Sequence, residues 1–200
     1  MTNGYSARSL IAALGALAIV TVASFALAAR RPDKPAFDAT DVTGVVWGPD
    51  FHLSGHDGKP YELANFRGKV VALYFGYTRC PDVCPTTMAA LGEARRLLGS
   101  DAARVQGLFV TVDPLHDKPA LLARYVASFD ESFIGLYGDA QATKRTAREF
   151  MIEAGREHSA PVFVFDTNGR LRLILRPNVA PQSIAHDVRL LLADRPNARS

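Results

Sequence analysis

The sequence predicts an α/β domain, a mixed β-sheet with helices on both faces, preceded by a long apolar segment. Apolar runs alternate with stretches of helical length, which is typical of strand–helix–strand crossovers and parallel strand pairing. An Asn-Gly turn between two late apolar runs requires antiparallel pairing at one end of the sheet. Of the 200 residues, 48% are hydrophobic and 22% are charged. This composition supplies a sizeable core and is too apolar for a disordered chain.

The N-terminal segment is expected to be a membrane anchor. Leu10–Ala29 contains no charged residue and is apolar at nearly every position. At about 1.5 Å per helical residue, such a run just crosses a hydrocarbon core roughly 30 Å thick. A cleaved secretory signal is the alternative, because Ala26-Leu27-Ala28 fits the small-x-small cleavage pattern. We expect an uncleaved anchor over residues 1–29, in a bacterial inner membrane, with the domain facing the periplasm or the cell exterior. A mitochondrial inner membrane is less favoured.

The remainder divides into a linker, one domain and a tail. Residues 30–36 form a polar spacer with two prolines, typical of an extended tether. The folded domain is expected over 37–195, and 196–200 form a frayed tail. Only Arg8 of the 23 Lys and Arg residues precedes Arg30, and 20 acidic residues balance the others. A nearly neutral domain without a clustered basic run argues against nucleic acid as a partner.

The domain is expected to begin with a hairpin followed by a buried strand. Phe51–Leu53 and Tyr61–Leu63 flank His56-Asp57-Gly58, and an Asp-Gly pair between apolar alternations indicates a hairpin. Lys69–Gly76 is continuously apolar, β-branched and aromatic, as in a strand buried on both faces. A helix over Pro85–Leu98 is expected to follow it.

The alternation continues to the C-terminus. The order of the elements, with the hairpin before them, is that of a thioredoxin-like domain with an added N-terminal β-hairpin. The expected elements are a strand over Arg104–Val112, a helix over Lys118–Phe129, a short strand over Phe133–Tyr137, a helix over Ala140–Glu153, strands over Pro161–Phe165 and Leu171–Leu175, and a helix over Pro181–Ala193.

The chemistry of the chain is expected at its two cysteines. Cys80 and Cys84 are separated by three residues, so a bridge between them closes a tiny loop and barely restrains the chain. Pro85 disfavours helical geometry at Cys84, which predicts that the helix begins with Pro85 and leaves Cys84 at or near the N-cap. There the unpaired backbone N–H groups and the helix dipole favour a thiolate.

Two nearby thiolates support two kinds of chemistry. They exchange electrons as a dithiol/disulfide pair, or they bind a soft metal ion. Structural zinc usually requires four protein ligands, and two cysteines exclude a site of four cysteines or of three cysteines and a histidine. Copper with a third, nitrogen ligand fits the sequence better.

These motifs resemble those of the Sco/SenC family. The resemblance is carried by Phe75-Gly76-Tyr77-Thr78, by the CPDVCP run over Cys80–Pro85, and by Thr111-Val112-Asp113-Pro114 with Asp117. It extends from about Phe37 to Ala193 in order and spacing. The family consists of thioredoxin-like copper chaperones that assist assembly of the cytochrome oxidase copper site and are usually tethered by an N-terminal helix.

The resemblance also implies the site residues. It assigns Cys80 and Cys84 as sulfur ligands of copper and His158, within Glu157-His158-Ser159, as the histidine ligand. It places Asp113 near the site. Asp113 then has three open roles: orienting His158, tuning thiol protonation, or capping the next helical turn.

Two functions follow from this set of residues. The first is a membrane-tethered copper chaperone that holds Cu(I) or Cu(II) and passes it to a copper-accepting subunit of cytochrome oxidase or to another copper chaperone. The second is a thiol-disulfide oxidoreductase, with Cys80 and Cys84 as a redox-active pair able to form a disulfide, that reduces the cysteines of a copper-site partner. His158 distinguishes them, because only the copper site needs it.

Overall fold

The computed structural model describes residues 36–45, 47, 49–152 and 160–194. Contacts within the chain separate two units, Met1–Ala36 and Phe37–Ser200. The predicted anchor over 1–29 lies outside the described residues. Within the described ranges, no helix has both the length and the apolar character needed to cross a bilayer.

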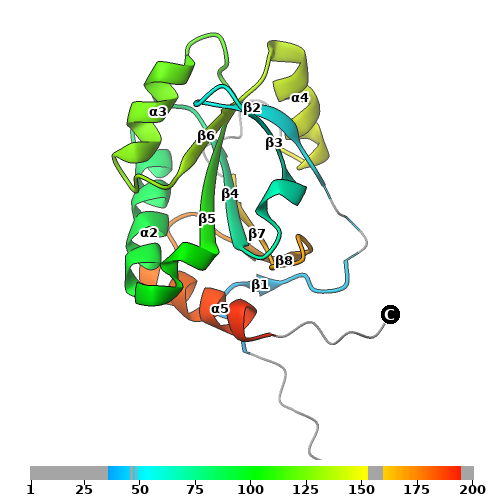
Figure 1. Ribbon diagram of the computed structural model, residues 1–200, viewed down its shortest axis with the longest axis vertical. Helices are drawn as coiled ribbons and strands as arrows, with labels where there is room; N and C mark the ends of the chain where they lie inside the picture. Colours follow the sequence, from blue (N-terminus) through cyan, green and yellow to red (C-terminus); the bar gives the residue numbers. More distant parts are fainter. Residues whose placement is uncertain (1–35, 46, 48, 153–159, 195–200) are drawn as a thin grey trace, which may run out of the picture. The chain divides into compact units, whose positions relative to one another are not determined.

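One mixed sheet of eight strands forms the centre of the second unit, in the order β1-β8-β7-β4-β5-β6-β2-β3 (Figure 1). This confirms the predicted mixed α/β sheet. The strands are β1 (Thr40–Asp41), β2 (His52–Gly55), β3 (Pro60–Glu62), β4 (Val70–Gly76), β5 (Val105–Thr111), β6 (Ile134–Tyr137), β7 (Val162–Phe165) and β8 (Leu171–Leu175). The helices are α2 (Val83–Leu97), α3 (Pro119–Ala127), α4 (Ala140–Glu149) and α5 (Pro181–Ala193), with 3-10 turns η1 (Leu63–Phe66) and η2 (Gly99–Arg104).

The middle of the sheet is fully buried. Strand β4 pairs in parallel with β5, and β5 in parallel with β6, as the crossover connections require. On its other side β4 pairs with β7 in the antiparallel direction. Every residue of β4 and β5 is buried, which explains why both strands are continuous apolar runs instead of alternating ones.

Helices cover both faces of this sheet. Helices α2, α3 and α5 lie on one face and α4 lies on the other (Figure 1). Alternation along β4 directs Tyr74 and Phe75 to opposite faces. The Phe75 ring packs against Phe150, just after α4, with the ring centroids 5.0 Å apart. On the opposite face, Tyr125 of α3 packs against Phe109 of β5 at 5.1 Å.

Local sequence signals account for several helix ends. Prolines at the first turn begin α3 and α5, and the Asp139 carboxylate caps α4 by accepting a hydrogen bond from the Ala142 N–H at 2.7 Å. The prediction that the helix starting at Ala140 continues to Glu153 is wrong, because α4 ends at Glu149. Met151 adopts a left-handed φ of 56°, which is incompatible with a continuing right-handed helix.

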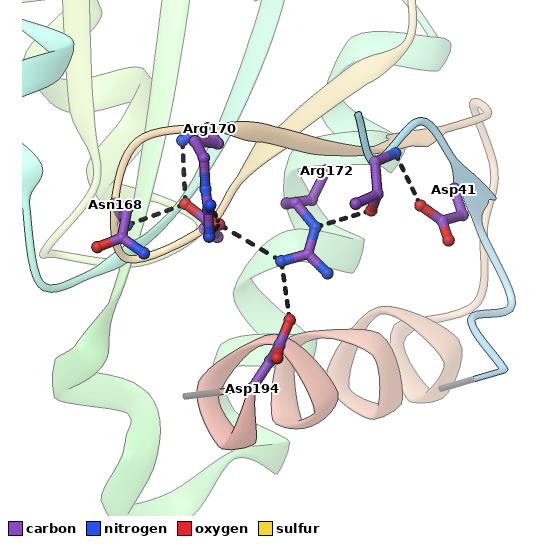
Figure 2. Close-up of polar contacts among 7 residues, drawn as sticks. Asp41, Asn168, Arg170, Arg172 and Asp194 are labelled. Atoms are coloured by element: carbon purple, nitrogen blue, oxygen red, sulfur yellow. Dashed lines mark hydrogen bonds and ion pairs between the residues drawn. The ribbon is translucent and has the colours of Figure 1, made fainter. Parts of the chain in front are cut away.

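A charged network ties the last hairpin to both ends of the domain (Figure 2). Asp166, in the turn between β7 and β8, is buried and accepts backbone hydrogen bonds from Asn168 and Arg170. The Arg172 guanidinium on β8 lies 3.4 Å from the Asp166 carboxylate and 2.9 Å from that of Asp194, directly after α5. Arg172 also donates to the Thr43 hydroxyl at 2.8 Å, which holds the segment after β1.

A second polar contact holds the start of the domain. The buried Asp187 carboxylate on α5 accepts the backbone N–H groups of Asp38 and Ala39, both at 2.9 Å. His186 lies beside it, with Nδ1 3.0 Å from the Asp187 carboxylate. The first described residues are therefore bound to the last helix.

Candidate functional site: a buried dithiol at the start of α2

The two cysteines lie where the central strand β4 passes into α2. The Cys80 N–H donates to the Tyr77 carbonyl at 3.1 Å, which makes a tight turn after the strand. Cys84 is the second residue of α2, since the helix begins at Val83 after Asp82 as N-cap. The predicted start at Pro85 is therefore wrong by two residues. The first four N–H groups of a helix have no partner within it, so Pro85 loses no hydrogen bond in the first turn.

Both sulfur-bearing side chains are buried. Cys80 is 5% exposed and Cys84 is 0% exposed, and no disulfide joins them in the structure. The Cys84 sulfur packs against β4 at Gly76, where a Cβ atom would lie only 2.9 Å from it. The Tyr74 hydroxyl donates a hydrogen bond to the same sulfur at 3.5 Å. Glycine and tyrosine on one strand therefore supply both the space and a polar contact for Cys84.

Burial controls the acidity of Cys84. Loss of solvent contact, followed by a hydrogen bond with the Cys80 thiol, raises the pKa of the Cys84 thiol from 9.0 to about 11. Hydrogen bonds from the Tyr74 hydroxyl and the Tyr77 backbone lower this pKa without reversing the shift. The expectation of a thiolate favoured by the start of the helix is wrong for the reduced, metal-free protein. A metal ion that binds here must displace a proton.

A buried carboxylate holds the cysteine loop against the end of β5. Asp117 accepts the Thr78 N–H at 3.0 Å and the Thr78 hydroxyl at 2.5 Å. It accepts a third hydrogen bond, at 2.6 Å, from the hydroxyl of Thr111, the last residue of β5. In the sequence Asp117 stands out only as part of the Sco/SenC motif, and no role was predicted for it. The sequence did contain a signal for this role. Thr78 and Thr111, which follow or end neighbouring strands, supply hydrogen-bond donors, and the Asp117 carboxylate in the next loop supplies the acceptor.

Asp113 contacts the cysteine loop through Arg79. The Arg79 guanidinium, one residue before Cys80, lies 2.7 Å from the Asp113 carboxylate. Helix α3 begins later, with Lys118 as its N-cap. Asp113 therefore sits beside the cysteine loop with Arg79 as its charged partner.

The predicted histidine ligand lies outside the described residues. His158 falls within 153–159, as do Glu157 and Ser159. The described chain resumes at Ala160, and Val162 pairs with Tyr74 in the antiparallel register of β7 and β4. The structure thus brings together Cys80, Cys84 and, through Arg79, Asp113.

The donor set fits a soft, thiophilic metal. Two thiol sulfur atoms that hydrogen-bond to each other lie in one turn, and the sequence contains no third cysteine. Thiolates prefer Cu(I) among the metals of proteins, whereas magnesium and calcium prefer oxygen ligands. The same pair of thiols is close enough for dithiol chemistry.

A mixed sheet with a buried dithiol at the first turn of the helix after its central strand defines a thioredoxin-like dithiol protein. The SCO1/SenC family model matches residues 41–193. A SCO2-like protein of Rickettsia felis is 30% identical over 176 residues, which cover 81% of this chain and 83% of that protein. The chain belongs to the SCO1/SenC family.

Solved structures agree with this assignment. The copper-bound structure of Bradyrhizobium japonicum ScoI matches with a TM-score of 0.63 and 30% identity, covering 72% of this chain and 99% of that one. Copper-bound yeast Sco1 matches with a TM-score of 0.68 and 26% identity, covering 83% of this chain and 98% of that one. Both relatives hold copper, and their fold is the fold described above.

Proposed function

We propose that this chain binds copper through Cys80, Cys84 and His158 and delivers it for assembly of a cytochrome oxidase copper site. The observation that carries the proposal is the pair of mutually hydrogen-bonded, buried thiols at the start of α2. Copper-bound relatives in the same family support the choice of metal. Asp113, paired with Arg79 beside the loop, acts next to the ligands and not as one of them.

Copper is the cargo of this site. The buried thiols exchange their protons for the metal, and the soft sulfur ligands favour Cu(I) over harder ions. The recipient is a copper-accepting subunit of cytochrome oxidase or another copper chaperone, whose own thiolates replace Cys80 and Cys84 one by one. Such an exchange needs no net oxidation of either protein.

The apolar run at Leu10–Ala29 supports a membrane tether. We propose that it anchors the chain in a bacterial inner membrane, with the domain over 37–195 on the periplasmic side. That side is where an exported copper site is assembled, and it allows dithiol chemistry.

The closeness of the two thiols also favours a second function, reduction of a partner's disulfide. In that reaction the partner's S–S bond breaks and gains two protons and two electrons, while Cys80 and Cys84 lose theirs and form a disulfide.

An anaerobic Cu(I) titration of the reduced full chain tests the first function. We expect one tightly bound ion per chain, monitored by competition with a chromophoric Cu(I) chelator. His158→Ala is expected to weaken binding at least tenfold, because it removes one of three ligands, and Cys84→Ser still more.

His116→Ala is the matched control, since this histidine is exposed in the loop that follows β5. It is expected to bind copper like the parent. Equal affinity in the parent and in His158→Ala would remove His158 from the site. No copper binding by the parent would leave disulfide reduction as the function of the pair.

A further inference from the structure

A buried tyrosine contacts the inner sulfur of the dithiol. Tyr74 on β4 is 0% exposed, and its hydroxyl donates to the Cys84 sulfur at 3.5 Å, within the range for sulfur hydrogen bonds. A buried tyrosine hydroxyl needs a partner, because it has lost its hydrogen bonds to water. Here the partner is the sulfur of a residue in the proposed metal site.

The approach of the sulfur to β4 depends on the absence of a side chain at Gly76. A Cβ atom at this position would lie 2.9 Å from the Cys84 sulfur and 2.9 Å from the Phe109 ring. Tyr74 and Gly76 alternate onto the same face of the strand, the face covered by α2. The strand therefore positions the sulfur by two independent contacts.

We propose that Tyr74 is a positioning residue of the dithiol site, whose hydroxyl holds the Cys84 sulfur and hydrogen-bonds to the negative charge that it carries in the metal-bound state. Hydrogen bonds to an ionised acceptor are roughly twice as strong as those between neutral groups. The contact therefore stabilises the metal-bound state most strongly. In the metal-free dithiol, where the Cys84 sulfur is neutral, the same hydroxyl supplies a weaker hydrogen bond that favours the dithiol over the disulfide. The metal part of this inference rests on the proposed function, whereas the dithiol part does not.

Tyr125 on α3 provides a matched control. Its ring packs on Phe109 at 5.1 Å between centroids, and the Tyr74 ring packs on the same phenylalanine at 6.3 Å. The Tyr125 hydroxyl is buried too, but has no hydrogen-bond partner within the described ranges. Removing either hydroxyl deletes one buried oxygen beside the same ring, and of the two variants only Tyr74→Phe removes a hydrogen bond to the Cys84 sulfur.

The deciding experiment uses the full chain without metal. Three proteins are equilibrated with glutathione: the parent, Tyr74→Phe and Tyr125→Phe. In this reaction the Cys80–Cys84 disulfide and two glutathione molecules are converted to the Cys80–Cys84 dithiol and one glutathione disulfide. Because the Tyr74 contact is made in the dithiol form, Tyr74→Phe is expected to shift this equilibrium several-fold toward the disulfide. Tyr125→Phe is expected to stay within twofold of the parent.

Cu(I) affinity gives the second readout. Loss of a hydrogen bond to a ligand typically weakens metal binding about 10–100-fold, and we expect Tyr74→Phe near the lower end of this range. Gly76→Ala, which pushes the sulfur away from β4, is expected to shift both readouts in the same direction. This second variant keeps the proposal open to refutation if Tyr74→Phe does not fold.

An unchanged glutathione equilibrium in Tyr74→Phe would overturn the proposal. Equal shifts in Tyr74→Phe and Tyr125→Phe would overturn it as well, because any buried hydroxyl would then suffice. A parent that binds no copper would refute the proposed function alone, since the glutathione equilibrium still decides the role of Tyr74.

Discussion

At Cys84, two physical effects act on one sulfur in opposite directions. The first turn of α2 favours a thiolate, because its N–H groups are unpaired and the helix dipole is positive there. Complete burial disfavours the charged form, and burial prevails, raising the pKa of this thiol to about 11. The reduced Cys84 side chain is therefore held as a thiol at neutral pH, protected from reagents that attack thiolates.

This shift makes the folded state sensitive to alkaline pH. The pKa of Cys84 is higher in the folded chain, about 11, than the ordinary 9.0, so the unfolded chain loses its proton first as pH rises. The stabilisation is complete below pH 9 and is lost between about pH 9 and 11. It amounts to roughly 2–3 kcal/mol at 1.36 kcal/mol per pKa unit. Urea unfolding of the reduced protein at pH 8 and pH 10.5 measures it.

Cys84→Ala is the reference for this measurement, because every other titrating group stays in place. We expect the parent to lose more unfolding free energy than Cys84→Ala between the two pH values. Parallel losses in the two proteins would show that the thiol is not held in its neutral form by the fold.

The site could be predicted from sequence as far as residue types and spacing allow. The CPDVCP motif identified Cys80 and Cys84, and the resemblance added Asp113. The state of Cys84 could not be predicted, because its burial depends on Tyr74 and Gly76, which face it from a strand. Helix capping is a local effect that sequence displays, whereas desolvation is set by the packing of distant segments.

At the scale of elements, the loop between β4 and α2 depends on Asp117. Its carboxylate binds both the backbone and the hydroxyl of Thr78 and the hydroxyl of Thr111. Asp117→Asn keeps the shape of the side chain but replaces one acceptor oxygen with an NH₂ group. This group is a donor and faces the Thr78 and Thr111 groups, which are donors themselves. We expect it to lower the free energy of unfolding by about 1–3 kcal/mol, measured by urea denaturation.

Asp113→Asn is the control from the same loop. Its partner Arg79 is largely exposed, so the ion pair contributes at most about 1 kcal/mol. A loss in Asp117→Asn no larger than that in Asp113→Asn would contradict the role given to Asp117.

The boundaries of helices and strands were predicted less accurately than the elements themselves. The strands and helices with strong periodicity were predicted within a few residues, and Leu171–Leu175 and Pro181–Ala193 to the residue. The start of α2 was misplaced, because a proline at the third helical position costs no hydrogen bond. Strand β1, with two residues, is too short to display any period and exists through its pairing with β8.

Over the whole molecule, Arg172 joins segments that are far apart in sequence. It links the β7–β8 turn, the segment after β1 and the end of α5 (Figure 2). Arg172→Ala leaves the buried Asp166 with one charged partner, Arg170, in place of two. We expect a loss of about 2–3 kcal/mol in unfolding free energy, by urea denaturation.

Arg170→Ala tests whether burial is the reason. This arginine pairs with the same Asp166 carboxylate at 3.0 Å, but its side chain is 62% exposed. We expect a loss of no more than about 1 kcal/mol. A loss equal to that of Arg172→Ala would mean that the number of ion pairs, and not their burial, sets the stability here.

The mixed character of the sheet could be predicted, but its strand order could not. Crossovers and the Asn-Gly turn fix which neighbours are parallel and which are antiparallel. The place of the β2–β3 hairpin beside β6 depends on pairing between Gly55 and Leu136. Nothing local in either segment specifies that contact.

The binding of Asp38 and Ala39 to Asp187 has a mechanical consequence. A pull on the chain at residue 36 is transmitted first to α5 and to the edge strand β1, which pairs with β8. Strand β7 lies between that edge and β4. Tension at the entrance of the domain is thus borne first by the hydrogen bonds to α5 and by the pairing of β1 with β8, and not by the loop between β4 and α2 that carries the sulfur atoms.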